Sequence, residues 1–235
     1  MPASGLTRRA RQSLARLRVR RGRRYGRFRL SPRLRSAERL VRSWIAALDP
    51  AFAARLPRLE VVPAEAIVRI SGRILLEASR DGCRGLRVAG DCSTQAVSYV
   101  RERVLVLHRR LLRQRWLGQR LFYHELCHFL WPRLAAGARR RYLKHLRREL
   151  AQAVRGELGY SAQDRKRRRL RRVRSGSAWR EYACESFCDT GAYALARAAG
   201  LGARLRSVEF TLAPRHRPGR LAAWQRALGR SSAQE

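Results

Sequence analysis

Residues 124–128 read His-Glu-Leu-Cys-His, within a segment that is apolar on nearly every side. In a helix, residues four positions apart lie one turn apart on the same face, so His124 and His128 can direct a ring nitrogen to one metal ion. Uncompensated histidines in a protein core are costly, whereas metal-bound histidines are not. The pattern therefore predicts a zinc site on a buried helix, flanked by the apolar residues Leu121, Phe122, Leu126, Phe129, Leu130 and Trp131.

Glu125 follows the first histidine, about 100° further round the same helix. This position borders the metal without binding it, which is where a general base must lie to take a proton from a zinc-bound water. The side chain of Cys127 points off the ligand face, and we expect it to pack in the core. The motif thus favours catalysis, with one Zn²⁺ per chain and Glu125 as the proton acceptor.

A catalytic zinc usually has three protein ligands and one open position, so one ligand is still missing. Candidates lie in residues 181–189 (EYACESFCD), where Glu181, Glu185 and Asp189 follow one another at helical spacing. A solvated face that pairs with surface arginine is the alternative interpretation of this acidic stripe. From the residues alone, both interpretations stay open.

The motif followed by a helix with Glu-x-x-x-Asp resembles the gluzincin metallopeptidases, the thermolysin-like group. The resemblance covers roughly residues 96–196 and implies that Glu185 is the third zinc ligand and that Asp189 hydrogen-bonds the far nitrogen of His124. It also implies a zincin-like fold whose substrate-binding edge strand is Val104–His108. In this chain Glu185 lies 57 residues after His128, beyond a basic insert at 133–178. The residue that would stabilise an oxyanion is left open among Tyr160, Tyr182, Tyr193 and His216.

The resemblance predicts a zinc-dependent hydrolase, most simply a metallopeptidase that acts on a peptide or protein substrate. A competing site uses Cys184 and Cys188, which are also four residues apart. Together with His124 and His128 they would form a closed Cys2His2 site that stabilises a fold without catalysis. The Cys184/Cys188 face is rotated by about 100° from the Glu185/Asp189 face, so we expect only one pair to face the metal. The alternative function is a nucleic-acid-binding protein with a structural zinc.

The charge balance indicates association with polyanions. The chain of 235 residues has 54 Lys and Arg against 17 Asp and Glu, a net charge of +37. Such a surface attracts nucleic acid with little sequence preference. The composition of residues 1–36 predicts a basic, flexible arm, and that of residues 165–174 predicts an exposed basic loop. Both segments are candidate nucleic-acid contacts. The five cysteines and the lack of a long apolar stretch predict reduced thiols, no membrane span and a cytoplasmic location.

The apolar patterns predict an α+β fold in which a small mixed sheet packs on the motif helix and on a second ligand-bearing helix. After the arm, residues 37–232 are expected to form one zincin-like domain. The expected strands are 59–62, 67–70, 74–77, 104–108 and 208–212, with turns at 81–91. The expected helices are 36–48, 114–131, 135–158, 179–199 and 221–228.

Overall fold

The computed structural model describes residues 22–64, 66–70, 73–77, 95–169, 176–202 and 209–229. The chain divides into two compact units, one of residues 3–129 and a second that begins at Leu130. The division falls inside the domain that we predicted for residues 37–232. No helix among the described residues is long and apolar enough to cross a membrane. The expected turns at 81–91 and most of the predicted arm, residues 1–21, lie outside the described residues.

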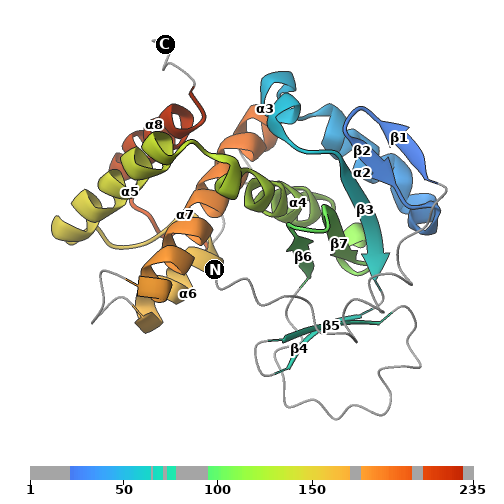
Figure 1. Ribbon diagram of the computed structural model, residues 1–235, viewed down its shortest axis with the longest axis horizontal. Helices are drawn as coiled ribbons and strands as arrows, with labels where there is room; N and C mark the ends of the chain where they lie inside the picture. The colour runs from blue at the N-terminus through green and yellow to red at the C-terminus, as the bar shows by residue number, and fades with distance from the viewer. Residues whose placement is uncertain are drawn as a thin grey trace. The chain divides into compact units, whose positions relative to one another are not determined.

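A five-stranded mixed sheet organises the unit of residues 3–129 (Figure 1). The two pairings that involve β3, with β2 and with β7, are parallel, whereas both outer pairings are antiparallel. Together with the helices, this sheet confirms the predicted α+β class. In their order across the sheet, the strands are β1 (Arg23–Tyr25), β2 (Phe28–Leu30), β3 (Leu59–Ala64), β7 (Val104–His108) and β6 (Ala96–Tyr99).

Strand β7 has the predicted bounds but not the predicted place. It lies between β3 and β6, and its first four residues are buried, as expected of an interior strand that is covered on both faces. The expectation that Val104–His108 is an edge strand is therefore wrong. The continuous apolar run already indicates an interior strand, because an edge strand rarely buries four successive side chains. The antiparallel edge on this side of the sheet is β6.

The predicted arm ends earlier than residue 36. Strands β1 and β2 form a hairpin in which Tyr25 pairs with Phe28, so the turn contains two residues, Gly26 and Arg27. Gly26 has a φ of 56°, which suits the first position of a tight hairpin turn. Phe28 and Leu30 are buried while Arg29 is less so, which is the alternation of a strand with one buried face. The dense arginines obscure this short apolar pattern in the sequence.

The helices of this unit pack through aromatic side chains. Phe122 of α4 (Arg115–Leu130) contacts Phe28 of β2 and Trp44 of α2 (Glu38–Ala46). Gly118 leaves room for Trp44, since a Cβ at this position would lie 2.6 Å from its ring. A 3-10 turn, η1 (Pro32–Ala37), precedes α2, so Ser36 is not its N-cap; α3 (Pro50–Arg55) follows. The remaining elements here are β4 (Ala66–Ile70) and β5 (Arg73–Glu77), which pair antiparallel, and η3 (Leu111–Arg113).

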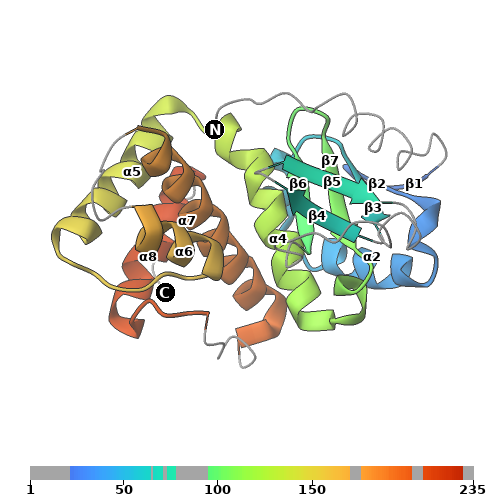
Figure 2. The same ribbon diagram turned by 90° about the horizontal axis from the view of Figure 1, so that it is seen from below.

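The second unit is helical. Helix α7 packs against α6 and α8, and α8 also packs against α5 (Figure 2). Part of the predicted basic loop at 165–174 belongs to α6, while residues 170–174 lie outside the described residues. The described part of the predicted strand 208–212 is not a strand, although Phe210 and Leu212 are buried there. The elements are η4 (Trp131–Arg133), α5 (Ala136–Ala151), α6 (Tyr160–Arg169), α7 (Gly176–Ala196), η5 (Arg197–Leu201), η7 (Pro214–His216) and α8 (Arg217–Ala227).

Candidate metal centre

The two histidines of the motif converge on helix α4. Their Nε2 atoms lie 3.2 Å apart, and the centroids of their rings are 5.0 Å apart. Two nitrogens that both bind a tetrahedral zinc at about 2.0–2.1 Å are roughly 3.3–3.4 Å apart. The distance between His124 and His128 therefore fits a shared metal ion. An N–H···N hydrogen bond between two neutral rings accounts for the same distance, and measurement of bound metal distinguishes the two cases.

Glu125 is oriented by a residue that the sequence analysis did not identify. Ser98 of strand β6 lies with its Oγ 2.7 Å from Glu125 Oε2 and 2.8 Å from the backbone oxygen of Glu125. The hydroxyl has one proton to donate, which these two acceptors share. Glu125 itself is buried, with 8% of its surface exposed. No local pattern predicts this contact, because it joins residues 27 positions apart on a strand and a helix.

Glu185, the predicted third ligand, forms an ion pair within its own unit. Its Oε1 atom lies 3.0 Å from Nη2 of Arg165 on helix α6, and both side chains are partly buried. Nη1 of Arg165 also donates to the backbone oxygen of Ser161. A carboxylate has two oxygens, so one can accept from a guanidinium while the other binds a metal. Arg165 therefore fixes the direction of Glu185 and also adds a positive charge beside it.

Asp189 connects α7 to the start of α6. Its Oδ2 atom accepts a hydrogen bond of 2.8 Å from the backbone nitrogen of Ala162, in the first turn of α6. An anion at this position satisfies an amide that has no partner within the helix. Gly159 permits the close approach, since a Cβ there would lie 2.3 Å from Asp189 Cγ. Asp189 thus has a structural role in this unit, and its predicted hydrogen bond to His124 stays a prediction.

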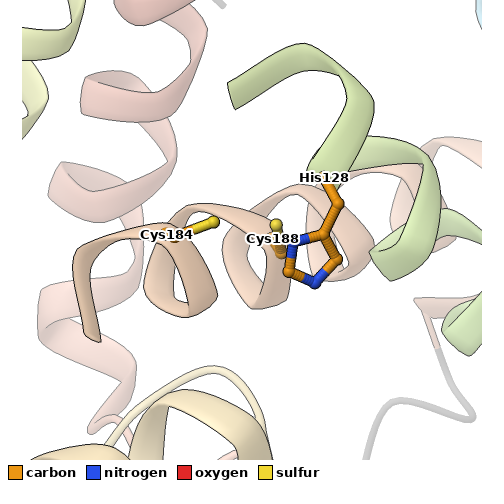
Figure 3. Close-up of side chains that lie close together, drawn as sticks. All are labelled: His128, Cys184 and Cys188. Carbon is orange, nitrogen blue, oxygen red and sulfur yellow. The ribbon is translucent and has the colours of Figure 1, made fainter. Parts of the chain in front are cut away.

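Among the described residues, two sets of three side chains place one potential ligand atom each within 4.8 Å of one another. The first set is His124, His128 and Glu185, and the second is His128, Cys184 and Cys188, shown in Figure 3. We expected that only one of the two faces of α7 would approach the histidines. Cys184 and Glu185 are neighbours in the sequence and each belongs to one of the two sets, so the expectation that only one pair faces the metal stays a prediction. These residues could hold a metal ion, and its identity is not determined.

The cysteines of both helices are buried and form no disulfide among the described residues. Cys127 and Cys188 are fully buried, and Cys184 is 6% exposed. The burial of Cys127 agrees with its predicted packing role. The two other cysteines of the chain, Cys83 and Cys92, lie outside the described residues. Buried thiols next to a histidine can bind a metal as thiolates or remain as small apolar side chains.

One of the predicted oxyanion stabilisers is already engaged elsewhere. Tyr182 is fully buried and donates a hydrogen bond of 2.6 Å to Glu157 Oε1. Burial, followed by the charge of Glu157, raises the pKa of Tyr182 well above its ordinary value. Tyr182 thus has a structural role, and its role as an oxyanion stabiliser stays a prediction.

The other candidates differ in exposure. Tyr193 is 6% exposed and packs against Phe210, and the side chain of Arg217 lies near its hydroxyl. His216 is partly exposed and accepts a hydrogen bond from Arg215. Tyr160 is 66% exposed. None of these three is assigned to the site by its contacts.

A buried ionic cluster, consisting of Arg220, Glu149 and Glu157, lies inside the helical unit. Arg220 is fully buried; its Nη1 lies 2.6 Å from Glu157 Oε2 and its Nε 2.9 Å from Glu149 Oε2. Burial by itself would raise the pKa of Glu149, but His145 and Arg220 lower this pKa to about 2. The pKa of Glu157 is also lowered, against the effect of burial, by Arg220 and Lys166. The cluster joins α5 and α8 to the segment before α6.

Comparison of the chain with known protein families, with curated proteins and with solved structures finds no match.

Proposed function

We propose that this protein is a zinc-dependent hydrolase that cleaves peptide bonds. The observation that carries the proposal is the 3.2 Å separation of the Nε2 atoms of His124 and His128, with Glu185 in the same set of potential ligands. Two histidines and a carboxylate are a ligand set of catalytic zinc sites, which keep a fourth position open for water. A zinc ion held there would lower the pKa of bound water and polarise a carbonyl oxygen.

In this proposal Glu125 moves the proton. Ser98 donates to Glu125 Oε2, so Oε1 is the oxygen that accepts a proton from the attacking water and delivers it to the leaving amine nitrogen. The hydrogen bond from Ser98 orients the carboxylate before the substrate binds. Burial of Glu125 limits competition from bulk water. Arg165 orients Glu185 in the same way, through Oε1.

The test of this mechanism is the change Glu125→Gln. An amide cannot accept the proton, so we expect hydrolysis of a peptide library to fall by roughly 10²- to 10⁴-fold. Bound zinc, measured by mass spectrometry of the purified protein, should stay at one per chain. Glu102→Gln is the matched control, since it removes an acid of the same unit outside the motif. Equal hydrolysis by wild type and Glu125→Gln would refute the mechanism.

A second candidate function is supported by the set His128, Cys184 and Cys188. Thiolates and a histidine are typical ligands of structural zinc. In this case the metal would stabilise the fold, and the basic surface, including the predicted contacts at 1–36 and 165–174, would bind nucleic acid. The cytoplasmic location remains a prediction under either function.

Substitution of the ligands separates the two candidates, because His128 belongs to both sets. We expect His128→Ala to lose zinc in either case. Glu185→Gln should lose zinc only if the carboxylate set binds it, with Glu181→Gln as the matched control, whereas His124→Ala should also lose zinc from a Cys2His2 site. Cys184→Ala/Cys188→Ala should lose zinc only if the thiolate set binds it. X-ray absorption of the wild type gives an independent answer: Zn–S distances of about 2.3 Å against Zn–N and Zn–O distances of about 2.0–2.2 Å.

A further inference from the structure

Helix α5 has one buried face and one cationic face. Tyr142, Leu146 and Glu149 lie on the buried face, with Ala138 one turn earlier. All five basic residues of the opposite face are exposed, and they extend over about 12 Å at a rise of roughly 1.5 Å per residue. These residues, which we call the α5 cationic face, are Arg140, Arg141, Lys144, Arg147 and Arg148.

No acidic side chain of the helix offsets this charge. The single acid of α5, Glu149, is 4% exposed and pairs with Arg220 and His145 on the inner side. The α5 cationic face therefore carries five positive charges and no exposed carboxylate from its own helix.

Two of the guanidinium groups are held in position. Arg147 lies over the ring of Trp179 at 5.1 Å from its centroid. Arg148 Nη2 lies 3.3 Å from His145 Nδ1, and His145 Nε2 lies 3.0 Å from Glu149 Oε1. With the proton on Nε2, His145 accepts from Arg148 and donates to Glu149. Side chains that are already ordered lose less conformational entropy when they bind a partner.

We propose that the α5 cationic face binds the phosphate backbone of a nucleic acid. Four of its five cations are arginines, whose planar guanidinium matches phosphate oxygens in a bidentate manner. A helix that lies on a lipid surface inserts apolar side chains, but no large apolar side chain of α5 is exposed. Protein interfaces depend on exposed aromatic or aliphatic anchors, and no such anchor is exposed on α5. The inference does not depend on the metal site.

The test compares two sets of three substitutions in the full chain. Arg140→Gln/Arg141→Gln/Lys144→Gln removes three charges from α5, and Arg39→Gln/Arg55→Gln/Arg58→Gln removes three exposed charges elsewhere. Fluorescence anisotropy with a labelled 30-base-pair DNA duplex, over a series of salt concentrations, measures affinity and salt dependence. The slope of log K against log salt should flatten by about 0.9 for each lost phosphate contact, so by up to about 2.7 in the α5 variant. Near 0.1 M salt this corresponds to a loss of affinity of up to about 500-fold.

The control set should change the slope by clearly less than the α5 set. Equal losses in the two sets would overturn the proposal, because binding would then depend only on net charge. Tighter binding to phosphatidylserine vesicles than to DNA, lost in the α5 set, would also overturn it. Circular dichroism and bound zinc show whether the α5 variant folds. If it does not fold, Arg140→Lys/Arg141→Lys keeps the charge and should retain the slope while weakening the affinity.

Discussion

Helices α4 and α7 carry the two halves of the candidate metal centre, and each positions its side chains differently. On α4, His124 and His128 converge through spacing along one helix, with their Nε2 atoms 3.2 Å apart. On α7, Glu185 and Asp189 have the same spacing, but both contact α6, through Arg165 and through the backbone of Ala162. The same four-residue spacing thus brings two potential ligands together on α4, whereas on α7 it gives two carboxylates that are bound to α6.

This difference shows how far a motif determines a site. His124 and His128 lie on one face of one helix, and the distance between their Nε2 atoms already fits a shared metal ion. Two carboxylates in a protein with a net charge of +37 encounter arginines and free amides, which compete for the same oxygens. The α7 half of the centre should therefore depend on the packing of its unit, whereas the α4 half should not.

The largest effect expected on the α7 side is that of Arg220→Met. The change leaves Glu149 and Glu157 buried without their common partner, and should lower the free energy of unfolding by about 3–5 kcal/mol. Urea denaturation, followed by circular dichroism, measures it. Arg226→Met is the matched control on the same helix, because Arg226 is exposed, and it should cost less than about 0.5 kcal/mol. A small effect of Arg220→Met would show that the cluster does not support α7.

The second-largest effect is expected at acidic pH, where the carboxylates of the same cluster take up protons and the stability falls. The pKa of Glu149 falls from 4.5 to about 2 on folding, so the unfolded chain takes up the proton first as the pH decreases. The stabilisation is complete above about pH 4.5 and is lost as the pH falls towards 2. A pKa difference of this size is worth about 3 kcal/mol. Urea denaturation between pH 6 and pH 3 should show the decline, and Glu149→Gln should flatten it. A wild-type curve that is flat over this range would contradict the assignment.

The smallest effect expected is that of Arg165→Gln on metal affinity. Arg165 pairs with Glu185 at 3.0 Å and repels a cation, although its partial exposure weakens the repulsion. Its loss should therefore make zinc bind roughly 10-fold more tightly, as measured by competition with a chelating dye. Arg167→Gln, which removes an exposed charge from the same helix, should change the affinity less. Weaker binding in Arg165→Gln would mean that orientation of Glu185 outweighs repulsion.

The sequence predicted what local patterns determine. The apolar run at 104–108 predicted strand β7 with the observed bounds, and the motif with its apolar flanks predicted α4 to within one residue at each end. The pairs Glu185/Asp189 and Cys184/Cys188 drew attention as ligand candidates because each has the four-residue spacing of one helix face. In these cases the determining interactions lie within one or two turns, or within one strand.

Other features could not be predicted because they join distant residues. Arg220 contacts Glu149 and Glu157, which lie 71 and 63 residues before it, and nothing in the sequence marks it among so many arginines. Ser98 and Glu125 meet only when β6 packs beside α4. The hairpin of β1 and β2 was hidden for a different reason: alternating arginines made a short strand pattern look like a disordered arm. The high arginine content led to the prediction of a flexible arm, whereas the alternation of apolar residues would have predicted the strand.

The order of the sheet gives its two edges opposite tendencies to self-associate. β1 is three residues long and exposes Arg23 and Arg24, so a second chain that approached this edge would meet like charge. β6 at the opposite edge begins Ala96-Val97-Ser98, with no charged side chain, and can accept an extended segment by strand addition. Under the proposed function, a peptide added there would lie beside Ser98, which contacts Glu125. Among the described strands, the two ends of the sheet therefore differ, since β1 exposes two positive charges and β6 carries none.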